Sequence, residues 1–272
     1  MQPMVTMALR AARSAGEIIF RSFEQVDRIN VEEKGAHDFV TEVDRASERA
    51  ILAALKKTYP THGFLAEESG LEPGKGEGAD WLWVIDPLDG TTNFIHGLPH
   101  FAISIAVKHK GVVEHGVIFD PMRQEEFTAS RGRGASVNGR RMRVTPKRTL
   151  DGALIGTGFP FRPEQRTYFP NYMNMFADIA EPTAGIRRAG AAALDLAYVA
   201  AGRMDGFWEF GLSEWDMAAG TLMVLEAGGL VSDAIGGHDY LRTGNVVCGN
   251  PKLLKQLLQT IQPHLHESQR NG

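Results

Sequence analysis

At 272 residues, the chain is long enough to bury a substantial core, and its composition of 43% hydrophobic and 23% charged residues is that of a soluble globular protein. A net charge of −4 gives no overall attraction to nucleic acid or to an anionic membrane, and no apolar run approaches the roughly 18 residues of a membrane span. One cysteine, Cys248, excludes an internal disulfide, so we expect an untargeted protein of the reducing cytoplasm.

The first half of the chain predicts two helices followed by strands, an α+β pattern. Apolar residues recur with helical spacing from Val5 to Phe23 and again from Val43 to Leu55, where Pro60 stops the helix. Strands are expected at 64–66, 81–85, 101–107, 112–119 and 125–129. The strands 101–107 and 112–119 form an antiparallel pair across a short connection. Residues 70–78 are expected to form a mobile glycine-rich loop.

Strands and helices alternate in the second half, which predicts an α/β arrangement with an open sheet. The strands are expected at 153–157, 205–210, 230–231 and 246–247. The helices are expected at 164–180, 191–201, 215–227 and 252–261. Residues 264–272 are expected to form a frayed tail. We place a boundary near residue 146, so that 1–146 and 147–272 form the two halves of one compact unit.

The most informative segment follows the apolar strand at 81–85. Asp86 stands at the end of this strand, and Asp89 follows three residues later, beyond Pro87. Two carboxylates and the carbonyl of Leu88 are the hard oxygen ligands that Mg²⁺ prefers. A turn in which an aspartate caps a helix would explain one of these residues, but not two around a proline.

A short helix is expected directly after this pair of aspartates. Gly90 permits an unusual backbone conformation, and Thr91 and Thr92 open the helix. The free N–H groups at a helix start suit a phosphate.

Three more acidic residues are candidates for the same site, and each of them also has a purely structural explanation. Glu67 ends a short strand, Asp44 begins the second helix, and Asp216 begins a later helix beside Trp215. Asp44 and Asp216 are equally well placed to stabilise helix N-termini, and Glu67 to be a surface carboxylate.

Taken together, these segments resemble the inositol monophosphatase family over nearly the whole chain, and most closely its bacterial SuhB type. The motifs that carry the resemblance lie at 64–69, 83–94 and 215–220, with supporting matches at 40–44, 190–192 and Glu209. The resemblance implies the layered αβαβα sugar-phosphatase fold, with an antiparallel N-terminal sheet and helices, and an α/β C-terminal half. It also implies that 1–146 binds metal and 147–272 binds substrate.

The resemblance further implies a role for each matching residue. A first Mg²⁺ would be held by Glu67, Asp86 and the Leu88 carbonyl, a second by Asp86, Asp89 and Asp216, and a third, weaker ion by Glu67. Thr91, oriented by Asp44, would position the attacking water and help to deprotonate it. The N–H groups of Gly90 and Thr91 would bind phosphate oxygens. The hydroxyls of the substrate would contact Glu209 and the backbone of Gly190, Ala191 and Ala192.

Simple electrostatics agrees with this assignment. Like charges 4 Å apart repel by roughly 4 kcal/mol at an effective dielectric near 20, so a cluster of carboxylates rejects a phosphate dianion until cations neutralise it. The motifs contain no histidine or cysteine, which disfavours zinc. Asp86 and Asp89 are poor nucleophiles as metal ligands, so attack by water is favoured over a phosphoenzyme.

Several functions remain open on the sequence alone. The acid Glu209 suits neutral hydroxyls and favours a monophosphate such as inositol 1-phosphate. A bisphosphatase acting on fructose 1,6-bisphosphate or a nucleotide bisphosphate would need a second cationic pocket, for which the candidates are Arg162, Arg166, Arg187 and Arg188. A protein that has lost its activity is disfavoured because every expected ligand type is present.

A binding role is the alternative of a different class. Proteins of the SuhB type are associated with the transcription antitermination complex on ribosomal RNA operons, which makes RNA polymerase and Nus factors expected partners. A basic stretch from Arg131 to Arg148 is the candidate contact surface, although such stretches are usually solvated faces. The family also implies a homodimer.

Overall fold

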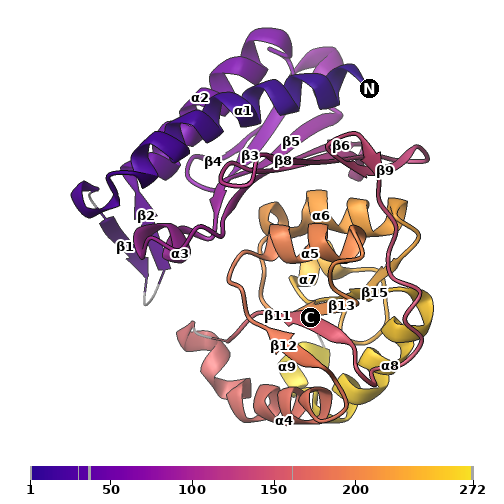
Figure 1. Cartoon of the computed structure of the whole chain (residues 1–272). Coiled ribbons are helices and arrows are strands. Elements are labelled where there is room, and N and C mark those ends of the chain that lie inside the picture. Colours follow the sequence, from indigo (N-terminus) through magenta and orange to yellow (C-terminus); the bar gives the residue numbers. More distant parts are fainter. Residues whose placement is uncertain (1, 30, 36–37, 161, 271–272) are drawn as a thin grey trace.

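Figure 1 shows a computed structural model of the chain, which describes residues 2–29, 31–35, 38–160 and 162–270. Its layers run from an outer pair of helices through a large sheet, a central pair of helices and a small sheet to a second set of outer helices. This order is the layered αβαβα architecture that the resemblance implied. Three apolar clusters fill the spaces between the layers.

The first layer consists of α1 (Pro3–Phe23) and α2 (Glu42–Thr58). A proline opens α1, where its missing N–H costs nothing, and the apolar positions of both helices fall on one face. Val5, Ile19, Ile51 and Leu55 are buried there against the large sheet.

The large sheet takes up most of residues 63–141. Its strands are β3 (Gly63–Ala66), β4 (Gly70–Glu72), β5 (Trp81–Asp89), β6 (Ala102–His109), β7 (Val112–Asp120), β8 (Glu125–Ser130), β9 (Gly134–Val137) and β10 (Arg140–Arg141). They lie in the order β10-β9-β8-β7-β6-β5-β3-β4. Each neighbouring pair is antiparallel except β3 and β5, which run parallel because the chain crosses between them through β4 and the loop that follows.

The central helices, α5 (Ala192–Ala200) and α6 (Glu214–Glu226), lie between the two sheets. They are apolar on nearly all sides because a sheet or a helix covers every face. Small residues let them approach closely. A Cβ on Gly220 would lie 2.5 Å from Cβ of Leu196, and a Cβ on Gly116 of β7 would lie 2.9 Å from the carbonyl oxygen of Ala219.

The small sheet comes entirely from the second half of the chain. Its strands are β11 (Leu154–Thr157), β12 (Gly185–Arg187), β13 (Gly206–Glu209), β14 (Leu230–Ser232) and β15 (Val246–Gly249), in the order β12-β11-β13-β15-β14. The strands β12, β11 and β13 are parallel, and β15 is antiparallel to its neighbours. Outer helices α4 (Phe169–Ala180) and α8 (Pro251–Ile261) cover its far face, and the free cysteine Cys248 is buried in β15.

Short elements complete the described chain. They are β1 (Val31–Gly35), β2 (Asp38–Thr41), α3 (Thr91–Ile95), α7 (Tyr240–Thr243), α9 (Glu267–Arg270) and the 3₁₀ turns η1 (Val26–Arg28), η2 (Gly76–Gly78), η3 (Pro163–Tyr168) and η4 (Gln262–His264). Residue 146 lies in the connection between the two sheets. In the described parts of the chain, no helix has both the length and the apolar character needed to cross a bilayer.

Away from the candidate site, three expectations about elements were wrong in detail. The segment 70–78, expected as a mobile loop, contains the edge strand β4 and the turn η2, because β4 pairs with β3. The helix expected at 164–180 is divided into η3 and α4, since Pro170 opens a new helix and cannot continue one. The tail expected to fray is folded as far as residue 270, where α9 buries Gln269.

Candidate active site

Asp86 and Asp89 reach the site because β5 continues through Pro87 instead of ending before it. Asp86 pairs with Ser104 and Asp89 with Ala102. Over this interval β5 therefore contains one residue more than β6, which makes a β-bulge. Such a bulge is a place where a strand tolerates proline, and it changes the direction in which the following side chains point. The hydroxyl of Ser47 donates to the Pro87 carbonyl at 2.8 Å and holds the bulge from α2. Our expectation that the strand ends at Ile85 was therefore wrong.

Gly90 joins the bulge to α3 in a conformation that favours glycine. Its φ of 96° is left-handed, and a Cβ there would lie 3.0 Å from the carbonyl oxygen of His100. The expected short helix begins directly after it, at Thr91. The backbone N–H groups of the first turn of α3 therefore stand beside the two aspartates.

Asp44 makes the contacts that both interpretations of it require. One oxygen, Oδ2, accepts from the Thr41 N–H at 2.8 Å and so closes the capping box at the start of α2. The other, Oδ1, accepts from the hydroxyl of Thr91 at 2.8 Å. Burial raises the pKa of Asp44, and the hydrogen bonds from Thr41 and Thr91 oppose that rise.

Glu67 and Asp216 arrive from two further elements. Glu67 directly follows β3, and its N–H donates to the Ile85 carbonyl at 3.2 Å, which ties it to β5. Asp216 is the third residue of α6, where its Oδ2 accepts from the Ser213 N–H at 2.7 Å. Asp216 thus caps a helix, as its structural alternative required, and also faces the site.

One cavity of about 140 Å³ collects the predicted residues. The candidates that line it are Glu67, Asp86, Leu88, Asp89, Gly90, Thr91, Gly190, Ala191, Ala192, Glu209 and Asp216. Asp44 does not line the cavity itself, but it accepts a hydrogen bond from Thr91, which does. Segments from both halves of the chain, far apart in sequence, therefore meet at one place.

The acidic groups of this cavity repel one another strongly. Burial raises the pKa of Asp86 well above its ordinary value, and the charges of Glu67, Asp89 and Asp216 raise it further. Asp89 behaves in the same way, first through burial and then through Asp216. The pKa of Glu209 rises to about 8 through burial and Asp216, against the opposing charges of Arg188 and Arg162. Such a cluster favours whatever brings positive charge into it.

The donor set suits a hard divalent cation. Asp86 and Asp89 each commit one oxygen to a backbone N–H, that of Leu88 at 2.9 Å and that of Ala193 at 2.7 Å, which fixes the orientation of both carboxylates. Within the described residues, no group of three or more His, Cys, Asp or Glu side chains is arranged so that it could hold an ion as it stands. The repulsion that raises the pKa of Asp86 also favours separated carboxylates, and a bound cation removes that repulsion. The residue types fit Mg²⁺, and their final approach would accompany its binding.

The opposite wall belongs to the C-terminal half. Glu209 ends β13, and the segment 190–192 leads into α5. The side-chain amide of Asn93 donates to the carbonyls of Ala189 at 2.9 Å and His100 at 2.8 Å, so α3 and the segment before α5 are joined. A Cβ on Gly158 would lie 1.8 Å from the Glu209 carboxyl carbon, so glycine is needed beside that acid.

Sequence reasoning missed several residues of the cavity. It is also lined by Phe39, Gly158, Phe159, Gln165, Phe210, Gly211 and Leu212. They come from loops and short elements that carry none of the motifs, so no pattern in the sequence could have placed them. Of the four arginines considered for a second cationic pocket, Arg162 and Arg188 line this cavity, and Arg187 lines another.

Comparisons with known proteins agree along the whole chain. A profile of the inositol monophosphatase family matches residues 1–268. The chain is 68% identical to the Nus factor SuhB of Pseudomonas aeruginosa, over 98% of this chain and 99% of that one, and 52% identical to the Nus factor SuhB of Escherichia coli over the same shares. Among solved structures it is similar to the SuhB protein of Bartonella henselae, with 44% identity, a TM-score of 0.92 and coverage of 97% and 100%. It is also similar to the Thermotoga maritima IMPase, with 34% identity, a TM-score of 0.87 and coverage of 98% and 100%.

Proposed function

Because this chain belongs to the inositol monophosphatase family, we propose that it hydrolyses small phosphate monoesters in the presence of Mg²⁺, with inositol 1-phosphate as the expected substrate. The observation that carries the proposal is the convergence of Glu67, Asp86, Asp89 and Asp216 beside the N-terminus of α3 in one cavity. Acidic groups next to backbone N–H donors suit a phosphate only when divalent cations lie between them.

The proposed ligands are those that the resemblance to the family implies. Glu67, Asp86 and the Leu88 carbonyl would hold one Mg²⁺, and Asp86, Asp89 and Asp216 would hold a second. Glu67 would also reach a third, weaker ion. The ions would supply Lewis acidity and neutralise charge on the phosphoryl group and the leaving oxygen. Asp86 belongs to both principal sites, so it is the residue whose loss costs most.

Thr91 and Asp44 handle the proton of the attacking water. The Thr91 hydroxyl donates to Asp44, 2.8 Å away, which leaves lone pairs on its oxygen to accept a hydrogen bond from water. As water attacks phosphorus, the bond from phosphorus to the ester oxygen breaks. The proton of the water passes to Thr91, the hydroxyl proton of Thr91 passes to Asp44 Oδ1, and the departing alkoxide takes a proton from solvent water. Burial raises the pKa of Asp44 and makes it a better acceptor for that proton.

The rest of the cavity orients the substrate. The N–H groups of Gly90 and Thr91 bind phosphate oxygens, and Glu209 with the backbone of 190–192 contacts hydroxyls of the alcohol. The cavity volume of about 140 Å³ suits a small polyol better than a long chain.

Phosphate release from a substrate panel tests this function. We expect turnover of inositol 1-phosphate with Mg²⁺, loss of turnover in excess chelator, and slower turnover of fructose 1,6-bisphosphate and a nucleotide bisphosphate. Asp86→Asn should reduce kcat by at least about 10² because it removes a shared ligand. Asp151→Asn, an exposed aspartate outside the cavity, is the matched control. Full activity in chelator, or a preference for either bisphosphate, would contradict the proposal.

A second function is favoured by the identity of 68% to a protein named Nus factor SuhB. We propose that the chain also binds RNA polymerase and Nus factors as a component of an antitermination complex in the cytoplasm, and that it forms a homodimer. The basic stretch from Arg131 to Arg148 is the candidate surface. Part of its positive charge is already neutralised, since Nε of Arg131 lies 3.6 Å from Oε1 of Glu114.

Asp86→Asn separates the two functions. If they are independent, this variant loses hydrolysis but keeps co-purification with RNA polymerase, whereas reversing the charges of Arg140 and Arg141 has the opposite effect. Light scattering of the purified chain measures the dimer. Loss of both functions in Asp86→Asn, with the fold intact, would show that a single site serves both.

A further inference from the structure

Two polar contacts fasten the first turn of α6, which carries Asp216, to strand β6 of the large sheet. The hydroxyl of Ser104 donates to the carbonyl of Trp215 at 3.1 Å. Nζ of Lys108 donates to Oε1 of Glu214 and forms an ion pair with it. Ser104 and Lys108 lie four residues apart in one strand, so their side chains leave β6 on the same face. Their partners are the two residues directly before Asp216.

Both contacts are shielded from water. Ser104 is 1% exposed, and the side chains of Lys108 and Glu214 are 15% and 21% exposed. In the surface ion pair of Lys56 with Glu72, by contrast, the side chains are 39% and 56% exposed. Breaking a shielded contact leaves polar groups without a partner, which costs more than breaking an exposed one. The start of α6 is therefore held firmly against the sheet.

Ser104 is also the cross-strand partner of Asp86. The two residues pair in the antiparallel register of β5 and β6, directly before the bulge in β5. The side chains of such a pair lie on the same face of a sheet, and their Cβ atoms are about 4.5–5.5 Å apart. Ser104 therefore contacts the helix that carries Asp216 and pairs with the residue Asp86 itself. One side chain connects two acids that come from different halves of the chain.

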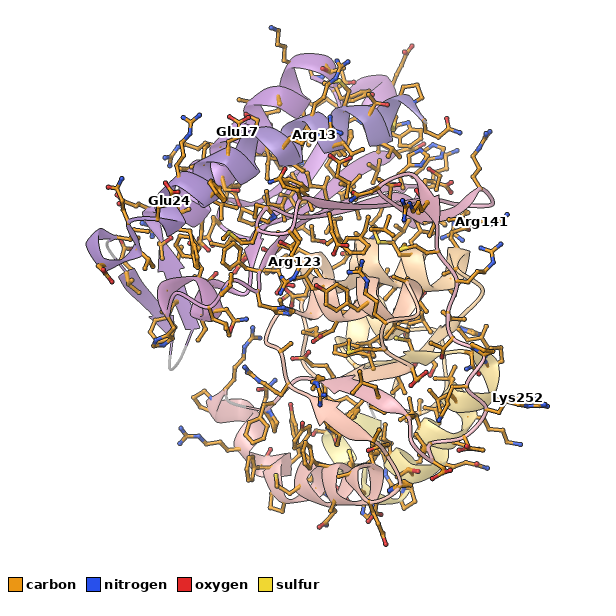
Figure 2. The ribbon with its side chains drawn as sticks, viewed as in Figure 1. Arg13, Glu17, Glu24, Arg123, Arg141 and Lys252 are labelled. Carbon is orange, nitrogen blue, oxygen red and sulfur yellow. The ribbon has the colours of Figure 1, made fainter. Side chains whose placement is uncertain are left out.

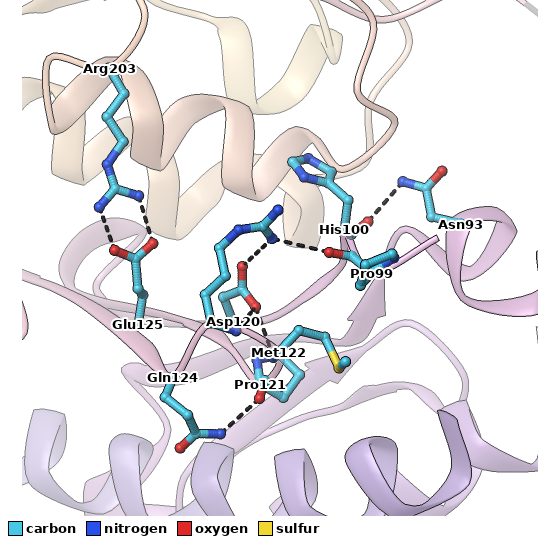
Figure 3. A network of polar contacts seen from close by, with 10 residues as sticks. Asn93, Pro99, His100, Asp120, Pro121, Met122, Gln124, Glu125 and Arg203 are labelled. Carbon is cyan, nitrogen blue, oxygen red and sulfur yellow. Dashed lines mark hydrogen bonds and ion pairs between the residues drawn. The ribbon is translucent and has the colours of Figure 1, made fainter. Parts of the chain in front are cut away.

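Strand β6 has little freedom to follow α6 if that helix moves. It lies inside the large sheet and pairs with β5 on one side and with β7 on the other. The segment before it is held as well, because Asn93 donates to the His100 carbonyl at 2.8 Å and Arg123 donates to the Pro99 carbonyl at 3.1 Å. Figure 3 shows these contacts. The strand is therefore a fixed support for the first turn of α6.

Asp216 needs such a support because its charge opposes its place in the cavity. Burial is the largest cause of the raised pKa of Asp86, and the charges of neighbouring acids, Asp216 among them, add to it. This repulsion pushes the start of α6 away from β5, and the contacts of Ser104 and Lys108 oppose that movement. The fold thus limits how far the two acids can separate before a cation arrives, which is preorganisation of a ligand set.

We propose that Ser104 and Lys108 are positioning residues that set the affinity of the second cation site by holding Asp216 in place. Their role rests on the proposed function, which assigns that site to Asp86, Asp89 and Asp216. Neither Ser104 nor Lys108 is among the residues that line the cavity, so both act through the first turn of α6 and not by contact with the cation.

This role is confined to one of the two principal sites. Asp216 belongs to the second site alone, whereas the first site uses Glu67, which is tied to β5 through its N–H and the Ile85 carbonyl. Asp86 is common to both sites and stays in the ladder of β5 and β6 whatever α6 does. Loss of a contact between β6 and α6 should therefore weaken binding of the second cation and leave binding of the first unchanged.

Titration of the full chain with Mn²⁺, followed by electron paramagnetic resonance of the free ion, tests the proposal without any turnover. Mn²⁺ prefers the same oxygen ligands as Mg²⁺. We expect the parent to bind at least two ions, and Asp216→Asn to lose one of them, which identifies the second site. In Ser104→Ala and in Lys108→Met the Kd of that ion should rise about tenfold, the usual effect of removing a group that orients a ligand. The Kd of the first ion should not change.

The sign of the change in Lys108→Met separates positioning from simple electrostatics. Removing a positive charge near an acidic site favours cation binding, so an electrostatic influence alone would lower the Kd. Lys108→Arg keeps the ion pair and should restore the affinity of the parent. Two matched controls should bind both ions as the parent does. They are Lys56→Met, at the surface pair with Glu72, and Ser130→Ala, at a buried strand hydroxyl 3.0 Å from Nδ1 of His115.

Circular dichroism shows whether each variant is folded, and the partly exposed Lys108 provides the test if Ser104→Ala does not fold. Two ions bound by the parent, with the second Kd unchanged or lowered in Lys108→Met, would overturn the positioning role and leave the proposed function standing. Equal weakening of both ions in the folded variants would do the same, since it shows a general structural effect. A parent that binds no Mn²⁺, or that binds it equally well as Asp216→Asn, would overturn the proposed function together with this role.

Discussion

Asp44 and Asp216 each use one carboxylate oxygen to close the N-terminus of a helix, and both also serve the candidate site. A helix start holds an acidic side chain in one orientation, because the backbone N–H groups and the helix dipole both favour it there. The structural and the functional interpretation of such a residue are therefore compatible. Substituting Asp44 would damage the helix and the site together, so Thr91 is the cleaner residue to test.

Thr91→Val is expected to lower kcat by about 10²–10⁴, because it removes the hydroxyl that links water to Asp44 while keeping the shape of the side chain. Thr91→Ser keeps the hydroxyl and should retain most of the activity. Steady-state kinetics on both variants, with circular dichroism to confirm folding, measures the effect. Equal losses in the two variants would show that the methyl group, and not the hydroxyl, matters.

Asp195 predicts a pH dependence of stability. Burial raises its pKa in the folded state, so the native protein keeps a proton that the unfolded chain releases above about pH 4. Stability from this group is complete below that pH and falls as pH rises toward the folded pKa, by at most about 1.4 kcal/mol per pH unit. Asp195→Asn removes this dependence.

Relative to the parent, the Asp195→Asn variant should therefore gain free energy of unfolding as pH rises above about 5. Urea unfolding of both proteins at several pH values measures the difference, in which the shared contributions of other groups cancel. Parallel pH profiles for the two proteins would contradict the prediction.

At the scale of elements, the site depends on irregularities. The bulge in β5 and the left-handed Gly90 turn a buried strand into a helix start within a few residues, and this brings two aspartates beside free N–H groups. The central helices depend instead on close approach, since Gly220 of α6 faces Leu196 of α5 without room for a Cβ.

Gly220→Ala tests that approach. Replacing glycine by alanine inside a helix usually stabilises it by about 0.5–1 kcal/mol. Here the new Cβ would lie 2.5 Å from Leu196 Cβ, so we expect a net loss of about 1–3 kcal/mol. Thermal unfolding measures it, and Leu196→Ala in the same chain should make the glycine substitution less harmful. A stabilised single variant would show that the two helices can move apart at little cost.

At the scale of the whole molecule, the acidic cavity is a source of instability that the fold tolerates. The side chains in Figure 2 show charged groups distributed over the surface, where water screens them, whereas the carboxylate of Asp86 is buried and feels the charges of Glu67, Asp89 and Asp216. Proteins commonly retain such strained groups at functional sites.

Mg²⁺ is therefore expected to stabilise the whole protein. At about 100 times its Kd, one bound ion adds about 2.7 kcal/mol to the free energy of unfolding, and the melting temperature rises accordingly. Asp86→Asn should melt higher than the parent in chelator, because one repelling charge is gone, and respond less to Mg²⁺. Calorimetric melting with and without the ion measures both effects.

The control for this experiment is Asp151→Asn, which should melt and respond to Mg²⁺ as the parent does. An equal response in Asp86→Asn would place the ion elsewhere. A lower melting temperature for Asp86→Asn in chelator would show that the hydrogen bond to Leu88 outweighs the repulsion.

Most of the regular elements could be predicted because their signals are local. The apolar faces of α1 and α2, the strands β6 and β7 and the start of α3 match the sequence pattern within a residue or two. Six strands were missed, namely β1, β2, β4, β9, β10 and β12. They are short edge or near-edge strands, whose existence depends on a neighbour that the local sequence does not specify.

What the chain itself determined is the chemistry: carboxylates after buried strands and at helix starts, a glycine that frees the backbone, and a threonine with a hydroxyl to donate. Only the tertiary structure decided which of these meet. The loops that place Arg162, Arg188 and Phe159 in the candidate cavity, and the packing that buries Asp195 with its Oδ1 unpaired among the described residues, depend on contacts between residues far apart in sequence. Local patterns carry no information about such contacts, because the free energy that fixes them comes from packing one layer against another.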